Sequence, residues 1–250
     1  MVAILDDKSA AIEYLSKELY ENLNAINYLR STDAKACVYN NDSNNGIIVW
    51  HEGESNFLAT KNPQFLSEWW DMLPVGHHVF SGVPSEVADV FLLEREPTWM
   101  NPCKVYALKG EFCHEVKSEH KCERLTPEDA GEVDEHYTYR HDDSLEWLRN
   151  DIINRDSSCV RINGELAAWC LVHGGDESLG PLYTKEKFRR QGLAELVSTD
   201  LIKKLIEKKH IPYVQIVENN HSSLGLIAKF GGMQYTHRCI WFGVDKLTAN

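Results

Sequence analysis

The stretch that most constrains the fold of this chain runs from Ser178 to Ala194, with the sequence SLGPLYTKEKFRRQGLA. Its first part, LGPLYT, predicts a β-strand, and Glu195 to Lys209 place apolar side chains at helical spacing. Gly192 and Ala194 stand between the two, where a small side chain lets a bound group approach the backbone. This order predicts an anion site at the start of the helix, because the first N–H groups of a helix have no partner within it.

Positive charge gathers just before this turn, at Lys185, Lys187, Arg189 and Arg190. The chain as a whole has 250 residues and a formal net charge of -12. An acidic chain with one basic loop suits a small anionic ligand, and a pyrophosphate matches both the cations and the helix N–H groups. The same net charge argues against general binding to nucleic acid or to an anionic membrane, since both reward basic surfaces.

The pattern Arg/Gln-x-x-Gly-x-Gly/Ala, after a strand and before a helix, resembles the acyl-CoA loop of the GNAT superfamily of N-acyltransferases. Arg189, Gly192 and Ala194 fill its three defined positions. The elements that follow, a strand IPYVQIV and an Asn-led helix NNHSSLGLIAKF, also come in that family's order. The resemblance covers residues 125–244, and the alternative is an ordinary strand–helix turn with a surface Arg pair.

The element order predicts an α/β (α+β) fold made of two GNAT-like halves. Each half is expected to be a mixed, mostly antiparallel sheet flanked by helices, with a degenerate half at 1–113, a linker at 114–124 and a catalytic half at 125–250. The N-terminal half has no glycine loop at its nearest equivalent, Val83-Pro84-Ser85, so only the C-terminal half is expected to bind CoA. Two halves with one competent site resemble the glycine N-acyltransferase-like family. The first half is expected to pack against the second and to help shape the acceptor pocket.

Two local patterns give definite expectations about secondary structure. Apolar residues at helical spacing predict one helix from Ser9 to about Arg30. Asn163-Gly164, between SCVRI and ELAAWCLVH, predicts a tight β-hairpin because both residues tolerate positive φ.

The resemblance implies which residues contact acyl-CoA. In such folds the pantetheine arm pairs with the strand before the loop, and the thioester carbonyl accepts a hydrogen bond from a backbone N–H of that strand. An asparagine that is common in this family, on the later helix, helps to hold the CoA arm. The residues that occupy these positions are Leu182, Tyr183 and Thr184 on the strand, Arg189, Arg190, Gln191, Gly192, Leu193 and Ala194 in the loop, and Asn220 and Ser223 on the later helix.

The resemblance also implies direct attack of the amine on the thioester in a ternary complex, which needs a base. Glu177, just before the strand, is the leading candidate, with a solvated turn residue as the alternative interpretation. His173 ends the preceding strand and is the second candidate, although a lone histidine there is more often a packed or capping residue. Many relatives carry a tyrosine that protonates the thiolate, but Leu226 to Ala228 stand there in this chain. Tyr235 or His237 is a possible substitute, or the thiolate leaves without an acid.

Other features of the sequence bear on the cellular compartment, on membrane insertion and on metal binding. Seven scattered cysteines without a CxxC pair, and an N-terminus rich in aspartate rather than arginine, predict a cytoplasmic chain. No apolar run approaches the length of a membrane span. Neither the His77-His78 pair nor the Cys/His group at 113–122 has zinc spacing, so no metal is expected. We expect a monomer or a weak homodimer.

The sequence therefore predicts an N-acyltransferase that uses acyl-CoA as cosubstrate, holds no permanently bound cofactor, and acts on a small amine or amino acid such as glycine. Arg161 and Arg238 are possible clamps for a carboxylate acceptor, whereas the net charge of -12 favours a cationic acceptor. Four tryptophans either line an acyl or acceptor pocket or belong to the core: Trp50, Trp69, Trp70 and Trp99. Two alternatives remain: a protein N-terminal or lysine acetyltransferase, and a non-catalytic CoA-binding protein. Acyl length and acceptor identity are left open.

Overall fold

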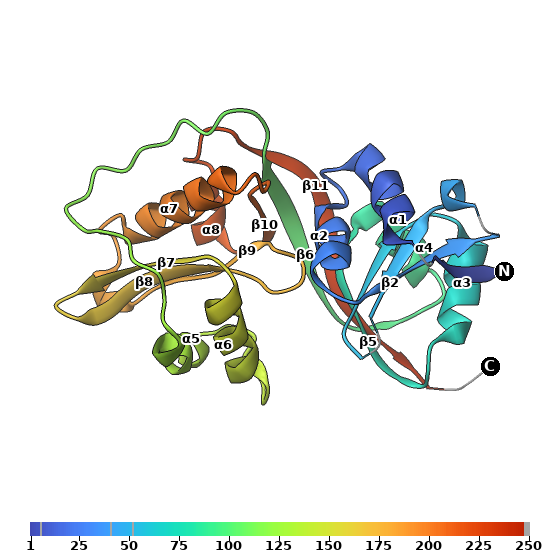
Figure 1. The fold of residues 1–250 in the computed structure, drawn as a ribbon. Helices are drawn as coiled ribbons and strands as arrows, with labels where there is room; N and C mark the ends of the chain where they lie inside the picture. Colours follow the sequence, from blue (N-terminus) through green and yellow to red (C-terminus); the bar gives the residue numbers. More distant parts are fainter. Residues whose placement is uncertain (6, 41, 52, 248–250) are drawn as a thin grey trace. The chain divides into compact units, whose positions relative to one another are not determined.

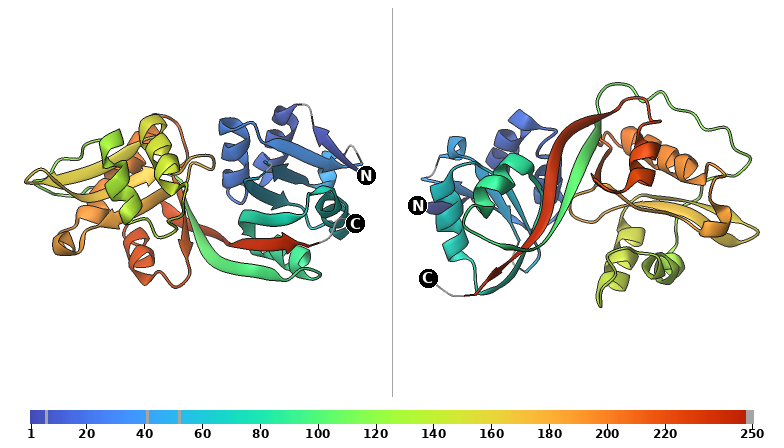
Figure 2. Two further views of the ribbon diagram at one scale, coloured as in Figure 1. Left: turned by 90° about the horizontal axis from the view of Figure 1, so that it is seen from below. Right: turned by 180° about the vertical axis from the view of Figure 1, so that it is seen from behind.

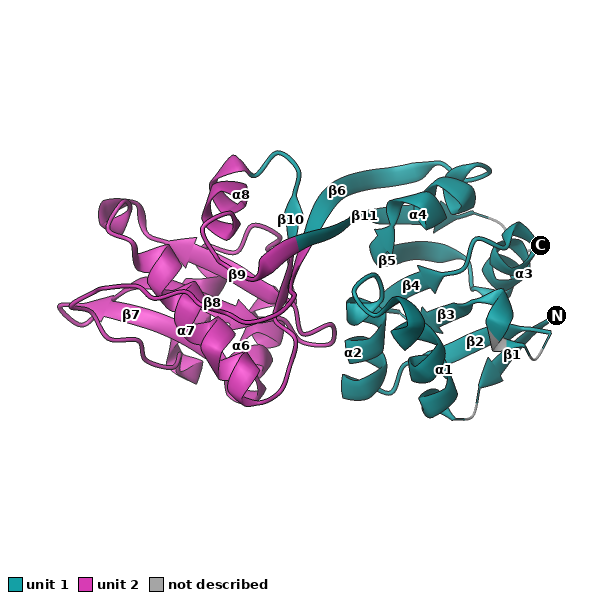
Figure 3. Cartoon of the chain, turned by 90° about the horizontal axis from the view of Figure 1, so that it is seen from above, with its two compact units in different colours: residues 1–105, 215–220, 235–250 teal, residues 106–214, 221–234 magenta. Residues whose placement is uncertain are grey.

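The computed structural model describes residues 1–5, 7–40, 42–51 and 53–247, which form two compact units (Figure 3). Unit 1 comprises residues 1–105, 215–220 and 235–250, and unit 2 comprises residues 106–214 and 221–234. None of the described helices combines the length and the apolar character that crossing a membrane requires.

The larger sheet has the strand order β1-β2-β3-β4-β5-β11-β6-β10 in the described part of the chain. Its pairs β1–β2, β2–β3, β3–β4 and β5–β11 are antiparallel, while β4 and β5 run parallel. The strands are β1 (Val2–Leu5), β2 (Lys35–Tyr39), β3 (Ile47–Trp50), β4 (Ser55–Ala59), β5 (Gly76–Pro84), β6 (Pro97–Leu108), β10 (Tyr213–Val217) and β11 (Met233–Lys246).

Both faces of this sheet are buried in unit 1. Along β2, Ala36 and Val38 pack toward one hydrophobic cluster while Cys37 and Tyr39 pack toward the other, as the alternation of side chains along a strand requires. The first cluster includes residues of α1 and α2, and the second includes residues of α3 and α4. These helices are α1 (Lys8–Leu15), α2 (Leu23–Ser31), α3 (Pro63–Met72) and α4 (Ser85–Leu92).

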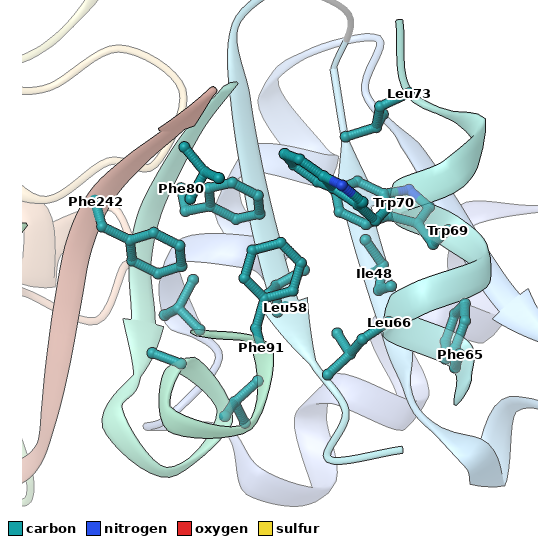
Figure 4. Packing of buried hydrophobic residues seen from close by; sticks show 14 of the residues in the cluster. Ile48, Leu58, Phe65, Leu66, Trp69, Trp70, Leu73, Phe80, Phe91 and Phe242 are labelled. Atoms are coloured by element: carbon teal, nitrogen blue, oxygen red, sulfur yellow. The ribbon is translucent and has the colours of Figure 1, made fainter. Parts of the chain in front are cut away.

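An aromatic cluster joins α4, β5 and β11 in the core of unit 1. Phe80 stacks on Phe242 with ring centroids 4.6 Å apart and planes 6° apart, and it lies 4.7 Å from Phe91 (Figure 4). Phe80, Phe91 and Phe242 each have no exposed surface. The last strand of the chain therefore completes the core that begins with the first residues.

Each compact unit is assembled from separate stretches of the chain, and the predicted halves at 1–113 and 125–250 stay a prediction. Residues 235–250 group with unit 1 because β11 lies between β5 and β6 (Figure 2). In the pairing of β11 with β5, Phe242 is opposite Phe80 and Val244 is opposite His78. Strand pairing between positions so far apart in the sequence leaves no trace in local periodicity.

The single helix predicted from Ser9 to about Arg30 is wrong. The chain forms α1, a 3₁₀ turn at Ser16–Glu18 and then α2. The buried amide of Asn22 donates to the carbonyl oxygens of Leu15 and Glu18, each at 3.1 Å, which satisfies backbone groups that a continuous helix would have bonded internally. The apolar spacing was compatible with both arrangements.

Unit 2 contains a three-stranded antiparallel sheet with the order β7-β8-β9. The predicted hairpin is confirmed, since Asn163 and Gly164 have φ of 53° and 80° and join β7 to β8. α5 and α6 pack on one face of this sheet and α7 on the other (Figure 1). The elements are β7 (Ser157–Ile162), β8 (Glu165–Val172), β9 (Leu179–Thr184), α5 (Ala130–Glu135), α6 (Ser144–Asn154), α7 (Leu193–Glu207) and α8 (His221–Ile227).

Candidate functional site

β9 is an edge strand of the sheet in unit 2. It pairs with β8 through Trp169 opposite Tyr183 and Cys170 opposite Leu182, and the described residues provide no strand on its other side. An exposed edge presents unpaired N–H and C=O groups to which an extended ligand can add as a further strand. The hydroxyl oxygen of Thr184 is buried and has no hydrogen-bond partner within the described ranges. Such atoms are normally satisfied, so the end of β9 has capacity for a ligand.

The chain turns sharply between β9 and α7. Arg190 has φ of 61° and Gly192 has φ of 77°, so two left-handed residues close to each other redirect the backbone. The side chain of Arg189 reinforces the turn, because its Nε–H donates to the carbonyl of Thr184 at 3.1 Å and its guanidinium lies over the Tyr183 ring. The buried side chain of Leu193 then fixes the start of the helix against the sheet.

The start of α7 is open to a ligand. A methyl group added to Gly192 would meet no atom within 4 Å. The first helical hydrogen bond that reaches back to Gly192 comes from the N–H of Leu196, at 3.0 Å. The N–H groups of the first turn before it are those that a helix leaves without internal partners. The residues present therefore fit a diphosphate group, with small atoms at the turn and backbone donors beyond it.

The charge around this loop differs from the expectation. Lys185 forms ion pairs with Glu132 and Glu165, and Lys187 pairs with Glu165 at 2.6 Å. These two lysines are thus largely neutralised by their neighbours. Arg189 is half-exposed, with Nη1 at a looser 3.5 Å from Glu186. The structure leaves the arginines, rather than the lysines, as the cations of the loop.

Glu177 lies in the turn before β9 with φ of 61°, and both oxygens of its carboxylate are engaged. Oε1 accepts from Nη1 of Arg155 at 2.7 Å, and Oε2 lies 3.1 Å from Nδ1 of His210. Only 16% of the side chain is exposed. A carboxylate held in this way fastens the turn to the end of α6 and to the segment after α7. Its predicted role as the base stays a prediction.

His173 follows β8 directly, and its backbone N–H donates to the carbonyl of Ser178 across the turn at 2.9 Å. Its half-buried ring lies beside the first residues of β9, since a methyl group added to Gly180 would come within 3.3 Å of Nε2. Tyr137 is the neighbouring aromatic residue, 6.5 Å away between ring centroids. No hydrogen bond or ion pair joins its imidazole to another side chain within the described part of the chain.

Two buried carboxyl groups accept hydrogen bonds from the turn that follows His173, and sequence reasoning assigned no role to Asp151. Asp151 on α6 and Asp176 in the turn are 9% and 5% exposed. Burial raises the pKa of both carboxyl groups, while the nearby His173 acts to lower it. A signal for Asp151 existed in the sequence, because it lies on the same helical face as the buried Leu148 and beside Ile152.

The other predicted contacts lie on separate elements. Asn220 precedes α8 and its N–H donates to the carbonyl of Val217 at 2.9 Å, while Ser223 lies within α8. Tyr235 lies on β11 and is 51% exposed. Asn220 and Tyr235 are grouped in unit 1, whereas Ser223 belongs to unit 2 together with His173 and Glu177. Their predicted roles stay predictions.

The residues considered as acceptor clamps and pocket walls have other partners. Arg161 pairs with Asp129 at 2.7 Å, and Arg238 pairs with Glu218 at 2.7 Å. Trp69 and Trp70 belong to the core of unit 1. In the described residues, no three His, Cys, Asp or Glu side chains are arranged to hold a metal ion.

The sequence was compared with protein-family models and with curated proteins. Residues 159–242, which include β9, the turn and α7, match the model of the family described as FR47-like protein. No curated protein sequence matches the chain significantly.

Three solved structures illustrate the likeness of the fold. A Drosophila protein is 16% identical with a TM-score of 0.75, and the match covers 100% of this chain and 99% of that one. An acetyltransferase from the GNAT family of Colwellia psychrerythraea is 15% identical with a TM-score of 0.56, over 98% and 100% of the two chains. A tandem GNAT protein from the clavulanic acid biosynthesis pathway is 10% identical with a TM-score of 0.55, over 98% of each chain. The predicted fold class is confirmed: this is a mixed α/β chain with a large, mostly antiparallel sheet flanked by helices, and its fold is similar to those of the GNAT structures.

Proposed function

We propose that this protein is an acyl-CoA-dependent N-acyltransferase that moves an acyl group from the CoA thioester to the amine of a small acceptor. The observation that carries the proposal is the open edge of β9 continuing into the turn at Gly192 and the start of α7. An acyl-pantetheine arm would pair with Leu182, Tyr183 and Thr184, and the diphosphate would lie against Arg189 to Ala194. Acyl-CoA enters as a substrate and leaves as CoA.

In this proposal the reaction is direct transfer in a ternary complex. The neutral amine attacks the thioester carbon, the C–N bond forms, and the C–S bond breaks as CoA leaves as thiolate. The surplus proton on the amine nitrogen must pass to a base. We assign this role to His173, because its imidazole is available whereas the carboxylate of Glu177 is held by Arg155 and His210. Tyr235 is our candidate for protonating the thiolate.

The acceptor is a small amine, and an amine without a carboxylate is the first choice. Arg161 and Arg238, the residues considered for binding the carboxylate of glycine, are already ion-paired. The net charge of -12 attracts cationic amines to the protein over distances comparable with the Debye length. Glycine remains the natural comparison, since two tandem halves are what the glycine N-acyltransferase-like family also has.

The test is release of free thiol from acetyl-, benzoyl- and long-chain acyl-CoA in the presence of amines, polyamines, glycine and a lysine peptide. We expect acceptor-dependent release with a small amine. The His173→Gln variant should lose about 10²- to 10⁴-fold in kcat and keep its affinity for CoA. Tight binding of acyl-CoA with no turnover on any acceptor would indicate a non-catalytic CoA-binding protein instead. Turnover on the peptide alone would indicate a protein acetyltransferase.

A further inference from the structure

Aromatic rings gather on the face of the unit 2 sheet against which α5 and α6 pack. Tyr183 of β9 is paired with Trp169 of β8, and the centroids of their rings are 5.1 Å apart. The imidazole of His136, directly after α5, stacks on the Tyr183 ring at 4.5 Å with planes 11° apart, and lies 5.8 Å from the Trp169 ring. Three rings therefore lie together on the strand that we propose for the acyl-pantetheine arm.

Further rings follow in the segment after α5. Tyr137 packs against the same hydrophobic cluster as Tyr183, and its ring centroid is 6.5 Å from that of His173 and 6.0 Å from that of Tyr139. Tyr137 is half-buried and Tyr139 is 53% exposed, so part of the ring surface is open to a ligand. The five residues that we call the aromatic row are His136, Tyr137, Tyr139, Trp169 and Tyr183.

The buried carboxylate of Asp134 holds the segment that carries three of these rings. Asp134 is 3% exposed, and it accepts from the Nε–H of Arg140 at 2.8 Å and from the hydroxyl of Ser144. The backbone N–H of Tyr137 donates to the carbonyl of Asp134 at 3.0 Å. Because this backbone is tied at both ends without a ligand, a ligand that binds the rings pays less entropy to order them.

The position of the aromatic row indicates which substrate it contacts. Tyr183 lies on the strand proposed for acyl-CoA, and Tyr137 lies beside His173, the proposed base. The acceptor is the substrate whose nitrogen must reach both the thioester and the base. Stacked and edge-to-face ring pairs are favourable beyond the apolar area that they bury, so these rings favour an acceptor with an aromatic group.

We infer that the aromatic row binds the ring of the acceptor, and that the acceptor class is the arylalkylamines. This inference rests on the proposed function and names the substrate class of the same site. The transfer itself is unchanged. The amine nitrogen forms the C–N bond to the acyl carbon, the C–S bond breaks as CoA leaves as thiolate, and the surplus proton passes to His173.

The first test compares two amines that share a carbon skeleton, 2-phenylethylamine and 2-cyclohexylethylamine, in acceptor-dependent thiol release from acetyl-CoA. Tyr139→Ser and His136→Leu should each raise KM for 2-phenylethylamine by about tenfold, the upper end of what one aromatic pair contributes. KM for the saturated amine should change by less than about threefold. Tyr139→Phe keeps the ring and should behave as the parent does.

The matched control is Trp147→Leu. Trp147 is an exposed aromatic residue of the same unit, on α6, and its ring contacts that of His141. This substitution should leave KM for both amines unchanged. An equal rise in KM for the two amines in Tyr139→Ser and His136→Leu, or no rise for either, would overturn the inference. A rise confined to KM for benzoyl-CoA would also overturn it, because the row would then bind the acyl group.

The second test does not need turnover. Calorimetry measures the binding of each amine to the protein saturated with CoA, which carries no acyl group. The parent should bind 2-phenylethylamine more tightly than 2-cyclohexylethylamine, and Tyr139→Ser should remove that preference. Equal affinities of the parent for the two amines would overturn the inference. Ring-dependent binding without thiol release from any acyl-CoA would instead defeat the proposed function and leave the row as a binding site for arylalkylamines.

Discussion

Gly192 shows how a single residue can be required by backbone conformation rather than by packing. Its φ of 77° lies in the left-handed region, and the space where a side chain would project is empty. A residue with a Cβ has a higher conformational energy at this φ. Its Cβ would also occupy the space beside the turn that is open to a ligand.

Gly192→Ala should therefore weaken binding of CoA more than it weakens the fold. We expect a loss of about 1 kcal/mol in the free energy of unfolding and a drop of tenfold or more in CoA affinity, measured by urea titration and by calorimetry. Gly131→Ala is the matched control, because Gly131 lies within α5 and its added methyl also meets no atom. It should leave CoA affinity unchanged. Equal CoA affinity for Gly192→Ala and the parent would exclude the turn as the phosphate site.

The buried acids make a pH-dependent contribution of known sign. The pKa of Asp176 is raised above its ordinary value of 3.8 by burial, so above that pH the folded state holds more protons than the unfolded state. The stability that Asp176 contributes is greatest below its pKa in the unfolded state. It is lost as pH rises through its pKa in the folded state. Asp176→Asn should reduce that loss.

The measurement is urea unfolding of parent and variant from pH 4 upward, and a substitution of opposite sign provides the comparison. Lys187 and Lys185 lower the pKa of Glu165. The contribution of Glu165 to stability is present above its unfolded pKa and is lost as pH falls. Glu165→Gln should therefore remove stability that the parent gains as pH rises. If the parent and Asp176→Asn differ by the same free energy at every pH, the carboxyl group is not the source of the dependence.

At the scale of elements, β11 is tied to α3 by one buried lysine. The Nζ of Lys246 donates to the carbonyl oxygens of Trp70, Asp71 and Leu73 at 2.8 to 2.9 Å, and the residue is 4% exposed. These carbonyls lie at the end of α3, where a helix leaves its last C=O groups without internal partners. The favourable placement of a cation at a helix C-terminus adds to the three hydrogen bonds.

Lys246→Met should cost about 2–4 kcal/mol in the free energy of unfolding, since it leaves buried carbonyls unsatisfied. Urea titration followed by tryptophan fluorescence measures this, because Trp69 and Trp70 lie in the same core. Lys208→Met is the control: its ion pair with Asp156 is at the surface and should contribute no more than about 1 kcal/mol. Equal costs for the two substitutions would mean that Lys246 does not cap α3.

At the scale of the whole molecule, the last strand of the chain belongs to a core built mostly from the first hundred residues. A polypeptide of residues 1–113 lacks β11, which provides Ile240, Phe242 and Val244 to that core. We expect it not to unfold cooperatively in urea, because the apolar face of β5 and the ring of Phe80 lose their partner.

Attaching residues 233–247 to the end of that polypeptide through a flexible Gly/Ser linker should restore a cooperative transition, because the missing strand is then available at high effective concentration. Circular dichroism and amide hydrogen exchange would follow both polypeptides. Cooperative unfolding of residues 1–113 without the added strand would show that the N-terminal half folds by itself, as the division drawn from the sequence expected.

The sequence by itself determined the strand–turn–helix around Gly192 and the hairpin at Asn163-Gly164, because φ preferences and apolar spacing act between residues close in the chain. The fold class followed from the order of the predicted elements together with the family resemblance. Only the tertiary structure decided that β11 pairs with β5, that Glu177 is held by Arg155 and that Asp151 accepts from the N–H of Gly174. Such relations depend on pairing and burial between distant segments, and composition and periodicity carry no information about which distant segments meet.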